Sequence, residues 1–298
     1  MKKFNKAFLF VVFVFAGVQL FGLSISMPEE TSQGNFITIS FEGTKKIVFA
    51  YVELFTKNEK PVQKVFAFPV DRYKKKFVAL VGIASWTSPG EYVLKMTVNE
   101  NKKISESTSS LLVNKTNFPE YTMRLDERNT NLVTKPDPKK AEEARVLTEI
   151  LTTFNTEAKP YEKTFLVPTP STRITSEFGE RRTHIYSSGK RGTEIHHGVD
   201  FGIPANSELV ASADGTVVFA GDRIVTGGTL VIEHAPGVYT LFYHLNKNLK
   251  KTGDKVVAGE VVALSGSTGF STGPHLHWEL RINTVPVSPF AVVERALY

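Results

Sequence analysis

The sequence of 298 residues contains no cysteine. This absence excludes a disulfide scaffold, a thiolate zinc site, an iron–sulfur cluster, a cysteine nucleophile and a lipid-modified N-terminal cysteine. Any bound metal ion must therefore be held by nitrogen and oxygen atoms. Apolar residues, in contrast, are not scarce. The hydrophobic content of 41% and the charged content of 22% are typical of a globular protein and exclude a fully disordered chain. The length predicts about two domains.

Long hydrophobic runs are lacking except at the N-terminus, where three lysines precede an apolar run over residues 7–23. This pattern, followed by small residues, predicts a secretory signal peptide over residues 1–26, cleaved near Ser24 or Ser26. An uncleaved anchor is the alternative, although about 17 residues are fewer than the roughly 20 that span a bilayer. We therefore expect an exported protein, located in a periplasm, at the cell surface or outside the cell.

A large excess of charge of one sign is also lacking. The formal net charge is +6, and removal of the three N-terminal lysines lowers it to +3. So mild a charge does not favour a nucleic-acid partner, although it is compatible with an acidic polymer such as a cell wall.

Apolar and polar residues alternate in short runs from residue 36 to about 115, with turns such as Pro89-Gly90 between them. Period-two runs without helical segments predict an antiparallel, Ig-like β-sandwich over residues 27–116. This region has no histidine and no carboxylate cluster, so we expect it to act as a spacer or as a cover for the other domain.

Residues 117–160 are expected to form a linker and a helix. Asp137 is a suitable N-cap and Pro138 suits the first helical position, so the apolar spacing that follows predicts a helix over 138–156. The alternation then returns over 161–298 with frequent glycines, which predicts antiparallel sheets with tight hairpins and no helices. The chain is therefore expected to be mainly β, with a sandwich, a short helical connector and a second antiparallel β domain.

All seven histidines lie in the last 115 residues, and two patterns among them indicate a metal site. The first is His196-x-Gly198-x-Asp200, and the second is His275-x-His277. Since side chains alternate along a strand, the members of each pattern are expected on one face, with Gly198 leaving room between its neighbours. Catalytic zinc typically takes three protein ligands and keeps a fourth position for water. One histidine and one carboxylate from the first pattern, with one histidine from the second, meet that count.

His244, at the end of the expected strand 237–245, is a further candidate. Zinc would lower the pKa of its water to about 7, and imidazoles that are not ligands would transfer protons or stabilise the oxyanion. A single histidine on a strand is more often structural than a ligand. We interpret His184, His197 and His234 as structural or surface residues.

Four segments, in order, carry a family resemblance: ITSEFGERR (174–182), HHGVDFGIPANSELVASADGTVVFAG (196–221), YTLFYHLNK (239–247) and GDKVVAGEVVALSGSTGFSTGPHLHWEL (253–280). Together they resemble the M23 metallopeptidases, the lysostaphin- and LytM-like zinc endopeptidases of bacterial cell walls. The resemblance covers about 125 residues, from Phe165 to Pro289. Residues 36–115 resemble, much less specifically, the β-sandwich that precedes this domain in some secreted members.

The resemblance implies a LytM-type peptidase domain with zinc held by His196, Asp200 and His277, and with His244 and His275 as the catalytic pair. No metal or catalytic position departs from the family pattern. The implied activity is hydrolysis of peptide cross-links in peptidoglycan by zinc-activated water. We expect a monomer with no nucleic-acid partner and no membrane contact beyond the signal segment.

Three alternatives remain open at this level. The protein could be a non-catalytic scaffold that binds the cell wall, or an activator of other wall hydrolases. It could also be a zinc hydrolase that acts on protein with the same residues. A further hypothesis is that the sandwich and the helix over 138–156 cover the groove until they are displaced.

Overall fold

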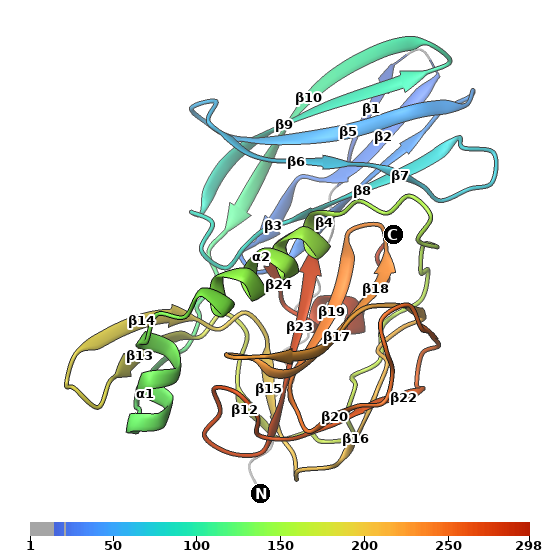
Figure 1. Cartoon of the computed structure of the whole chain (residues 1–298). Coiled ribbons are helices and arrows are strands. Elements are labelled where there is room, and N and C mark those ends of the chain that lie inside the picture. The colour runs from blue at the N-terminus through green and yellow to red at the C-terminus, as the bar shows by residue number, and fades with distance from the viewer. Residues whose placement is uncertain (1–14, 21) are drawn as a thin grey trace, which may run out of the picture.

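The computed structural model describes residues 15–20 and 22–298 (Figure 1). The chain is mainly β, as predicted, with 49% of the described residues in strands and 10% in helices. Two five-stranded sheets face each other in the N-terminal part, and a larger sheet forms the centre of the C-terminal part (Figure 1).

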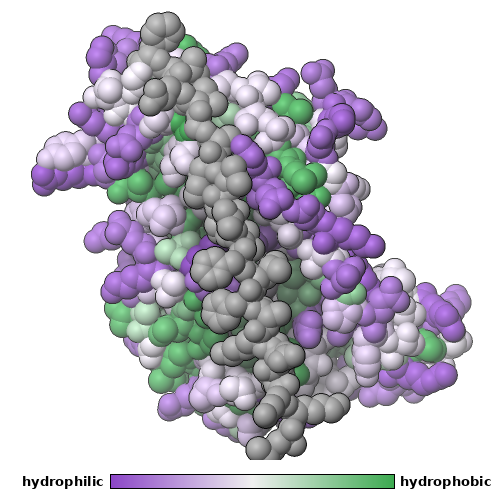
Figure 2. All heavy atoms as spheres, turned by 180° about the vertical axis from the view of Figure 1, so that it is seen from behind, coloured by the Kyte–Doolittle hydropathy of each residue, from purple (hydrophilic) through white to green (hydrophobic). Residues whose placement is uncertain are grey.

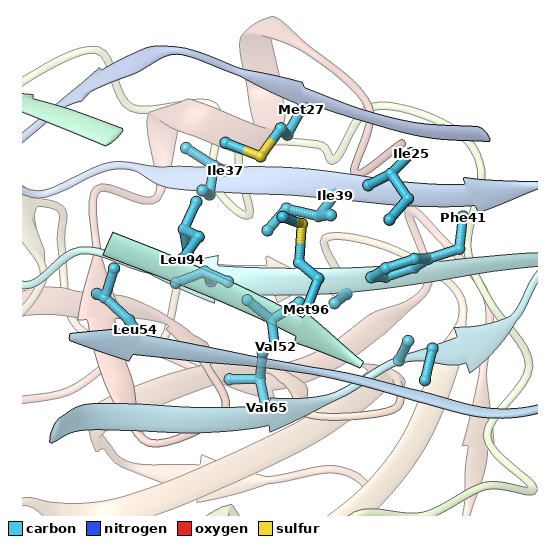
Figure 3. Close-up of a cluster of buried hydrophobic side chains, with 14 of the residues drawn as sticks. Ile25, Met27, Ile37, Ile39, Phe41, Val52, Leu54, Val65, Leu94 and Met96 are labelled. Atoms are coloured by element: carbon cyan, nitrogen blue, oxygen red, sulfur yellow. The ribbon is translucent and has the colours of Figure 1, made fainter. Parts of the chain in front are cut away.

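The sandwich encloses its own apolar core. Ile37, Ile39 and Phe41 are alternate residues of one strand. Their side chains point toward Val52 and Leu54 of the other sheet (Figure 3). Neighbouring strands are antiparallel, as predicted, apart from the parallel pair β3 and β10. The first sheet has the order β1 (Phe15–Leu20), β2 (Leu23–Pro28), β4 (Phe36–Glu42), β8 (Lys76–Gly82) and β7 (Phe68–Pro69). The second has the order β3 (Glu30–Ser32), β10 (Lys103–Asn114), β9 (Gly90–Glu100), β5 (Ile47–Thr56) and β6 (Pro61–Phe66).

The predicted signal peptide overlaps this sandwich. Residues 1–14 and 21 lie outside the described residues, whereas strand β1 and the start of β2 belong to the first sheet. Leu23 and Ile25 of β2 are each 3% exposed and lie in the sandwich core. Cleavage near Ser24 would remove Leu23 from the core, and cleavage near Ser26 would remove Ile25 as well, so the cleavage position remains a prediction.

Two helices form the connector. The predicted helix is α2 (Pro138–Thr152), capped by the side chain of Asp137, and it ends earlier than residue 156 because Thr153 is already extended. The helix α1 (Glu127–Thr134) lies in the segment expected to be a linker. Its N-cap is Asp126, whose carboxylate accepts from the backbone N–H of residue 129 at 2.7 Å, a capping pattern that the sequence does contain.

The C-terminal part is built on antiparallel sheets, as predicted. The largest has the order β12 (Ile174–Ser176), β15 (Val199–Gly202), β23 (His275–Ile282), β19 (Val238–Leu245), β18 (Gly227–Ala235), β17 (Gly215–Arg223) and β21 (Lys255–Val256), with β24 (Val285–Val287) on β23. A smaller sheet contains β16 (Glu208–Val210), β22 (Val261–Leu264) and β20 (Lys247–Asn248). In a third, β11 (Glu120–Arg124) pairs in parallel with β13 (Arg181–Ile185), which pairs with β14 (Arg191–Ile195). The expectation of no helix is wrong at the end of the chain, where α3 (Phe290–Glu294) is found.

A second apolar core joins the two parts. Phe36, Phe68 and Leu80 of the sandwich are buried in one cluster with Leu280 and Ile282 of strand β23. The contact is close: a Cβ atom at Gly82 would lie 2.9 Å from the Cβ of Val285. Burial of this apolar surface fixes the sandwich against the large C-terminal sheet, because separation would expose it to water.

The outer surface mixes polar and apolar side chains. On the face opposite to that of Figure 1, apolar residues gather in separate patches between polar ones (Figure 2). Within the described part of the chain, the helices are too short or too polar to cross a lipid bilayer.

Candidate metal centre and active site

Three side chains converge at one point of the large sheet. The Nε2 atom of His196 lies 3.0 Å from Oδ1 of Asp200, and Nδ1 of His277 lies 2.8 Å from the same oxygen. The two ring nitrogens are 2.9 Å apart. All three side chains are buried. Burial of polar groups costs free energy unless they are paired, and here they pair with one another.

The two sequence patterns meet because their strands are neighbours. Strands β15 and β23 are antiparallel, with Asp200 directly opposite His277. The alternation expected for the second pattern is confirmed, since Leu276 is fully buried on the opposite face. The expectation that His196, Gly198 and Asp200 lie on one face of a single strand is wrong. His196 lies in the turn before β15, and this strand begins only at Val199.

Gly198 is required for this turn to approach the site. A Cβ atom at this position would lie 2.4 Å from the carbonyl oxygen of Trp278 and 2.8 Å from Nε2 of His277. The absence of a side chain at Gly198 leaves space, as predicted. Strand β23 occupies that space.

Each of the three side chains is held from its outer side. Nδ1 of His196 donates to the carbonyl of Glu177 at 2.7 Å. Nε2 of His277 donates to Oε1 of Glu279 at 3.0 Å. Oδ2 of Asp200 accepts from Nη2 of Arg182 at 2.8 Å. The nitrogen or oxygen that remains on each side chain therefore points at the common centre, as in metal sites whose outer partners orient the ligands.

The sequence interpretation missed Arg182 and Glu279. Glu279 could have been found, since it shares the strand face of His275 and His277 by alternation. Arg182 comes from strand β13, which is distant in sequence from Asp200, and no spacing rule connects the two residues.

The electrostatics of the centre suit a cation. Burial alone would raise the pKa of Asp200, but the hydrogen bonds and charges of His196 and His277 outweigh it and hold that pKa well below its usual range. Burial alone would lower the pKa of His277, yet the hydrogen bonds with Asp200 and Glu279 raise it to about 9. The pKa of His196 is lowered, mainly by burial. The surroundings of His277 thus favour a positive charge beside Asp200, and a metal cation bound there would take the place of the proton on Nδ1.

The donor set fits a metal ion. It consists of two imidazole nitrogens and one carboxylate oxygen, and these atoms all lie within 4.8 Å of one another. Ligand atoms bound at about 2.0–2.1 Å in a tetrahedral site are roughly 3.4 Å apart, so separations of 2.8–3.0 Å need to widen by only a few tenths of an ångström.

Two further imidazoles lie beside this centre. The rings of His244 and His275 have their centroids 4.6 Å apart. Their Nδ1 atoms are 2.8 Å from the carbonyl oxygens of Thr268 and Gly273, so each Nδ1 carries the proton and each Nε2 keeps its lone pair. Nε2 of His275 is 3.9 Å from Oδ1 of Asp200.

Both of these imidazoles are neutral near pH 7. Burial, reinforced by the charges of His275 and His277, lowers the pKa of His244 to about 3. The pKa of His275 is lowered as well, mainly by burial. His244 has a φ of 62°, in the left-handed region that few non-glycine residues adopt, and such backbone outliers concentrate at functional sites.

A cavity of about 570 Å³ opens over these residues. This volume lies within the range that accommodates small organic ligands and short peptides. Its walls include the connector residues Tyr121, Met123 and Leu147, together with Arg173 and Arg223 of the C-terminal part. None of the described sandwich residues lines it.

The remaining histidines differ in their surroundings. His184 and His234 are buried, and Nε2 of His234 is 2.7 Å from the hydroxyl of Thr240, in agreement with a structural interpretation. His197 instead lines the rim of the cavity, where Nη2 of Arg281 approaches its Nδ1 at 3.3 Å.

Comparison with known proteins shows which family this C-terminal part resembles. Residues 194–289 match the model of Peptidase family M23. Over 125 residues, or 42% of the chain, the sequence is 43% identical to the DD-carboxypeptidase/endopeptidase Mpg of Neisseria meningitidis. Over 116 residues, or 39% of the chain, it is 40% identical to the peptidoglycan DD-endopeptidase ShyA of Vibrio cholerae. These matches span 28% and 26% of the two relatives, so the chain covers little more than a quarter of their length.

The fold is similar beyond the matched segment. A crystal structure of a peptidase M23 from Pseudomonas aeruginosa superposes with a TM-score of 0.56 at 26% identity, covering 82% of this chain and 87% of that chain. The chain therefore belongs to peptidase family M23, a family of metallopeptidases.

Glu279→Gln is expected to weaken metal binding about 10- to 100-fold while the protein stays folded, because His277 loses the carboxylate that orients its ring. Competition with a chelator of known affinity measures this. Glu233→Gln is a matched control, since Glu233 is a buried glutamate that contacts Asn155 and Tyr239 instead of the site. Equal metal affinity in Glu279→Gln and the unaltered protein would contradict the orienting role.

Proposed function

We propose that this protein is an exported zinc endopeptidase that hydrolyses peptide cross-links in peptidoglycan. The observation that carries the proposal is the convergence of His196, Asp200 and His277, with the lone pairs of His244 and His275 beside them in an open cavity. The named activities of the relatives Mpg and ShyA support the substrate class.

In this proposal His196 Nε2, Asp200 Oδ1 and His277 Nδ1 hold zinc. Zinc, when bound, supplies a Lewis acid that polarises the scissile carbonyl and makes water nucleophilic near neutral pH. Arg182 and Glu279 keep the carboxylate and the imidazole aligned through the hydrogen bonds described above. The absence of cysteine is consistent with this nitrogen and oxygen ligand set.

His244 and His275 transfer the protons of the reaction. Each is neutral and presents an unprotonated Nε2, so either one can accept a proton from the attacking water. The imidazolium that forms can then stabilise the oxyanion or donate its proton to the leaving amine. The carbonyls of Thr268 and Gly273, which fix Nδ1–H of each ring, hold the tautomers that this transfer needs.

The first test is a digest of purified sacculi, with the products identified by mass spectrometry. We expect cross-linked muropeptides to disappear and monomers to accumulate, and a zinc chelator to prevent both changes. The masses of the products identify the bond that is cleaved. Addition of zinc after removal of the chelator is expected to restore the activity.

Intact cross-links after incubation with folded, zinc-loaded protein would contradict the endopeptidase. That outcome would favour the alternative of a wall-binding scaffold or an activator of other hydrolases. A sedimentation assay with the same sacculi then distinguishes the two, because a scaffold still binds the wall.

Export is proposed from the basic and apolar N-terminal segment alone. N-terminal sequencing of the protein from separated cell fractions tests it. A full-length chain in the cytoplasm would contradict export. A mature chain that begins before Leu23 would preserve the sandwich core, whereas one that begins at residue 27 would lack two of its buried side chains.

A further inference from the structure

The chain has two tryptophans, and they are in opposite surroundings. Trp278 is fully buried in the core of the peptidase sheet. Trp86 is 51% exposed and lies in the sandwich, in the connection between strands β8 and β9. A single exposed apolar side chain needs no explanation by itself, so the surroundings of Trp86 decide what it can do.

The backbone on both sides of Trp86 is fixed. Ser85 is fully buried, and its hydroxyl and carbonyl accept from the guanidinium of Arg181 at 3.2 and 2.6 Å. The carbonyl of Thr87 accepts from Nε2 of Gln33 at 2.6 Å. Trp86 is therefore presented on a rigid loop, which lowers the entropy that binding would otherwise lose.

The loop that carries Trp86 is joined to the candidate metal centre through two neighbouring residues of strand β13. Arg181 precedes Arg182 on strand β13, and successive side chains of a strand point to opposite faces. One face thus holds the sandwich loop through Ser85, and the other holds Asp200. The position of Trp86 relative to the catalytic cavity is set by this strand.

The indole packs beside a residue that lines the cavity. Its centroid is 5.4 Å from that of the His197 ring, with the two planes inclined at 48°. His197 lines the cavity together with Arg281, whose guanidinium approaches it at 3.3 Å. The exposed indole and this imidazole thus form a continuous aromatic surface that runs outward from the cavity onto the sandwich.

We infer that Trp86 and His197 form a subsite for an amino-sugar ring of the glycan strand. The inference rests on the proposed function. Each stem peptide of peptidoglycan is attached to a sugar, so a peptide in the cavity leaves that sugar outside the rim. The face of a pyranose ring carries C–H groups that pack on an exposed indole, while the polar edge of the sugar stays in water. The sandwich then contributes directly to the binding of polymeric substrate.

The test compares Trp86→Ala with Trp86→Phe, which keeps an aromatic face. Tyr73→Ala is the control, because Tyr73 is a 61% exposed aromatic of the sandwich whose ring lies against Arg72 instead of a residue that lines the cavity. Binding of an N-acetylglucosamine tetramer is measured by calorimetry. The value of kcat/KM is measured on sacculi and on a glycan-free cross-linked peptide, and thermal melting verifies that each variant folds.

We expect Trp86→Ala to lose about 3- to 10-fold in tetramer affinity and in kcat/KM on sacculi, with the glycan-free peptide cleaved as before. Trp86→Phe and Tyr73→Ala are expected to stay close to the unaltered protein. Failure of the unaltered protein to bind the tetramer, or an equal loss on the glycan-free peptide, overturns the subsite. If neither substrate is cleaved, the proposed function fails, and the calorimetric comparison still decides the role of Trp86.

Discussion

His277→Ala is expected to abolish retention of the metal ion and, with it, the peptidase activity. The substitution removes one of three converging ligand atoms and leaves Asp200 and Glu279 without the imidazole between them. Loss of a direct ligand should exceed the 10- to 100-fold effect of losing an outer partner, so we expect affinity to fall by more than about 100-fold. Metal analysis after dialysis, together with chelator competition, measures it.

His275→Ala is the matched control for this prediction. His275 lies two residues earlier on the same face of strand β23, but it is outside the group of converging ligand atoms. The His275→Ala variant should therefore keep one metal ion per chain while losing activity. Stoichiometric metal in His277→Ala would show that His277 is not a ligand, and thermal melting of both variants verifies that the fold persists.

His244→Asn is expected to keep the metal ion and to lower kcat by about 10²- to 10⁴-fold, the usual contribution of a general acid or base. Asparagine suits this position because it tolerates the positive φ of 62° better than alanine does. The variant loses the Nε2 lone pair that faces the cavity, whereas His196, Asp200 and His277 are unchanged. Single-turnover rates on a cross-linked peptide, measured beside the metal content, test the prediction.

The two variants separate binding from proton transfer. Loss of metal from His244→Asn would make His244 a ligand and overturn the division of roles. Unchanged kcat would instead leave His275 as the residue that transfers protons. Equal residual activity in His244→Asn and in the double variant with His275→Ala would indicate that the two imidazoles act as one unit.

The apolar core between the sandwich and the peptidase sheet bears on the hypothesis of a removable cover. Phe36 and Phe68 pack on Leu280 and Ile282, so a fragment beginning at residue 160 would expose this surface. Lower activity of such a fragment could follow from instability alone. The cavity itself is bordered by the connector, so variants of Tyr121 or Leu147 in the full chain test access to it more directly.

The local sequence determined the strand content, the helix that begins after Asp137, and the shared face of His275 and His277. These features depend on neighbours a few residues apart, where alternation and capping act. The family, too, could be recognised from the four ordered segments, three of which lie within residues 194–289, the part of the chain that matches the family model. The sequence predicted that Gly198 leaves room beside His196 and Asp200, but the close approach of strand β23 to Gly198 was not predicted.

Only the tertiary structure decided which groups surround the converging side chains of His196, Asp200 and His277. Arg182 reaches Asp200 from another sheet, and Trp86 reaches His197 from another part of the chain. Likewise, Leu23 and Ile25 belong to a core although their sequence reads as the end of a signal segment. The physical reason is that such contacts depend on how sheets pack, and packing is set by buried surface summed over distant residues, which no local spacing records.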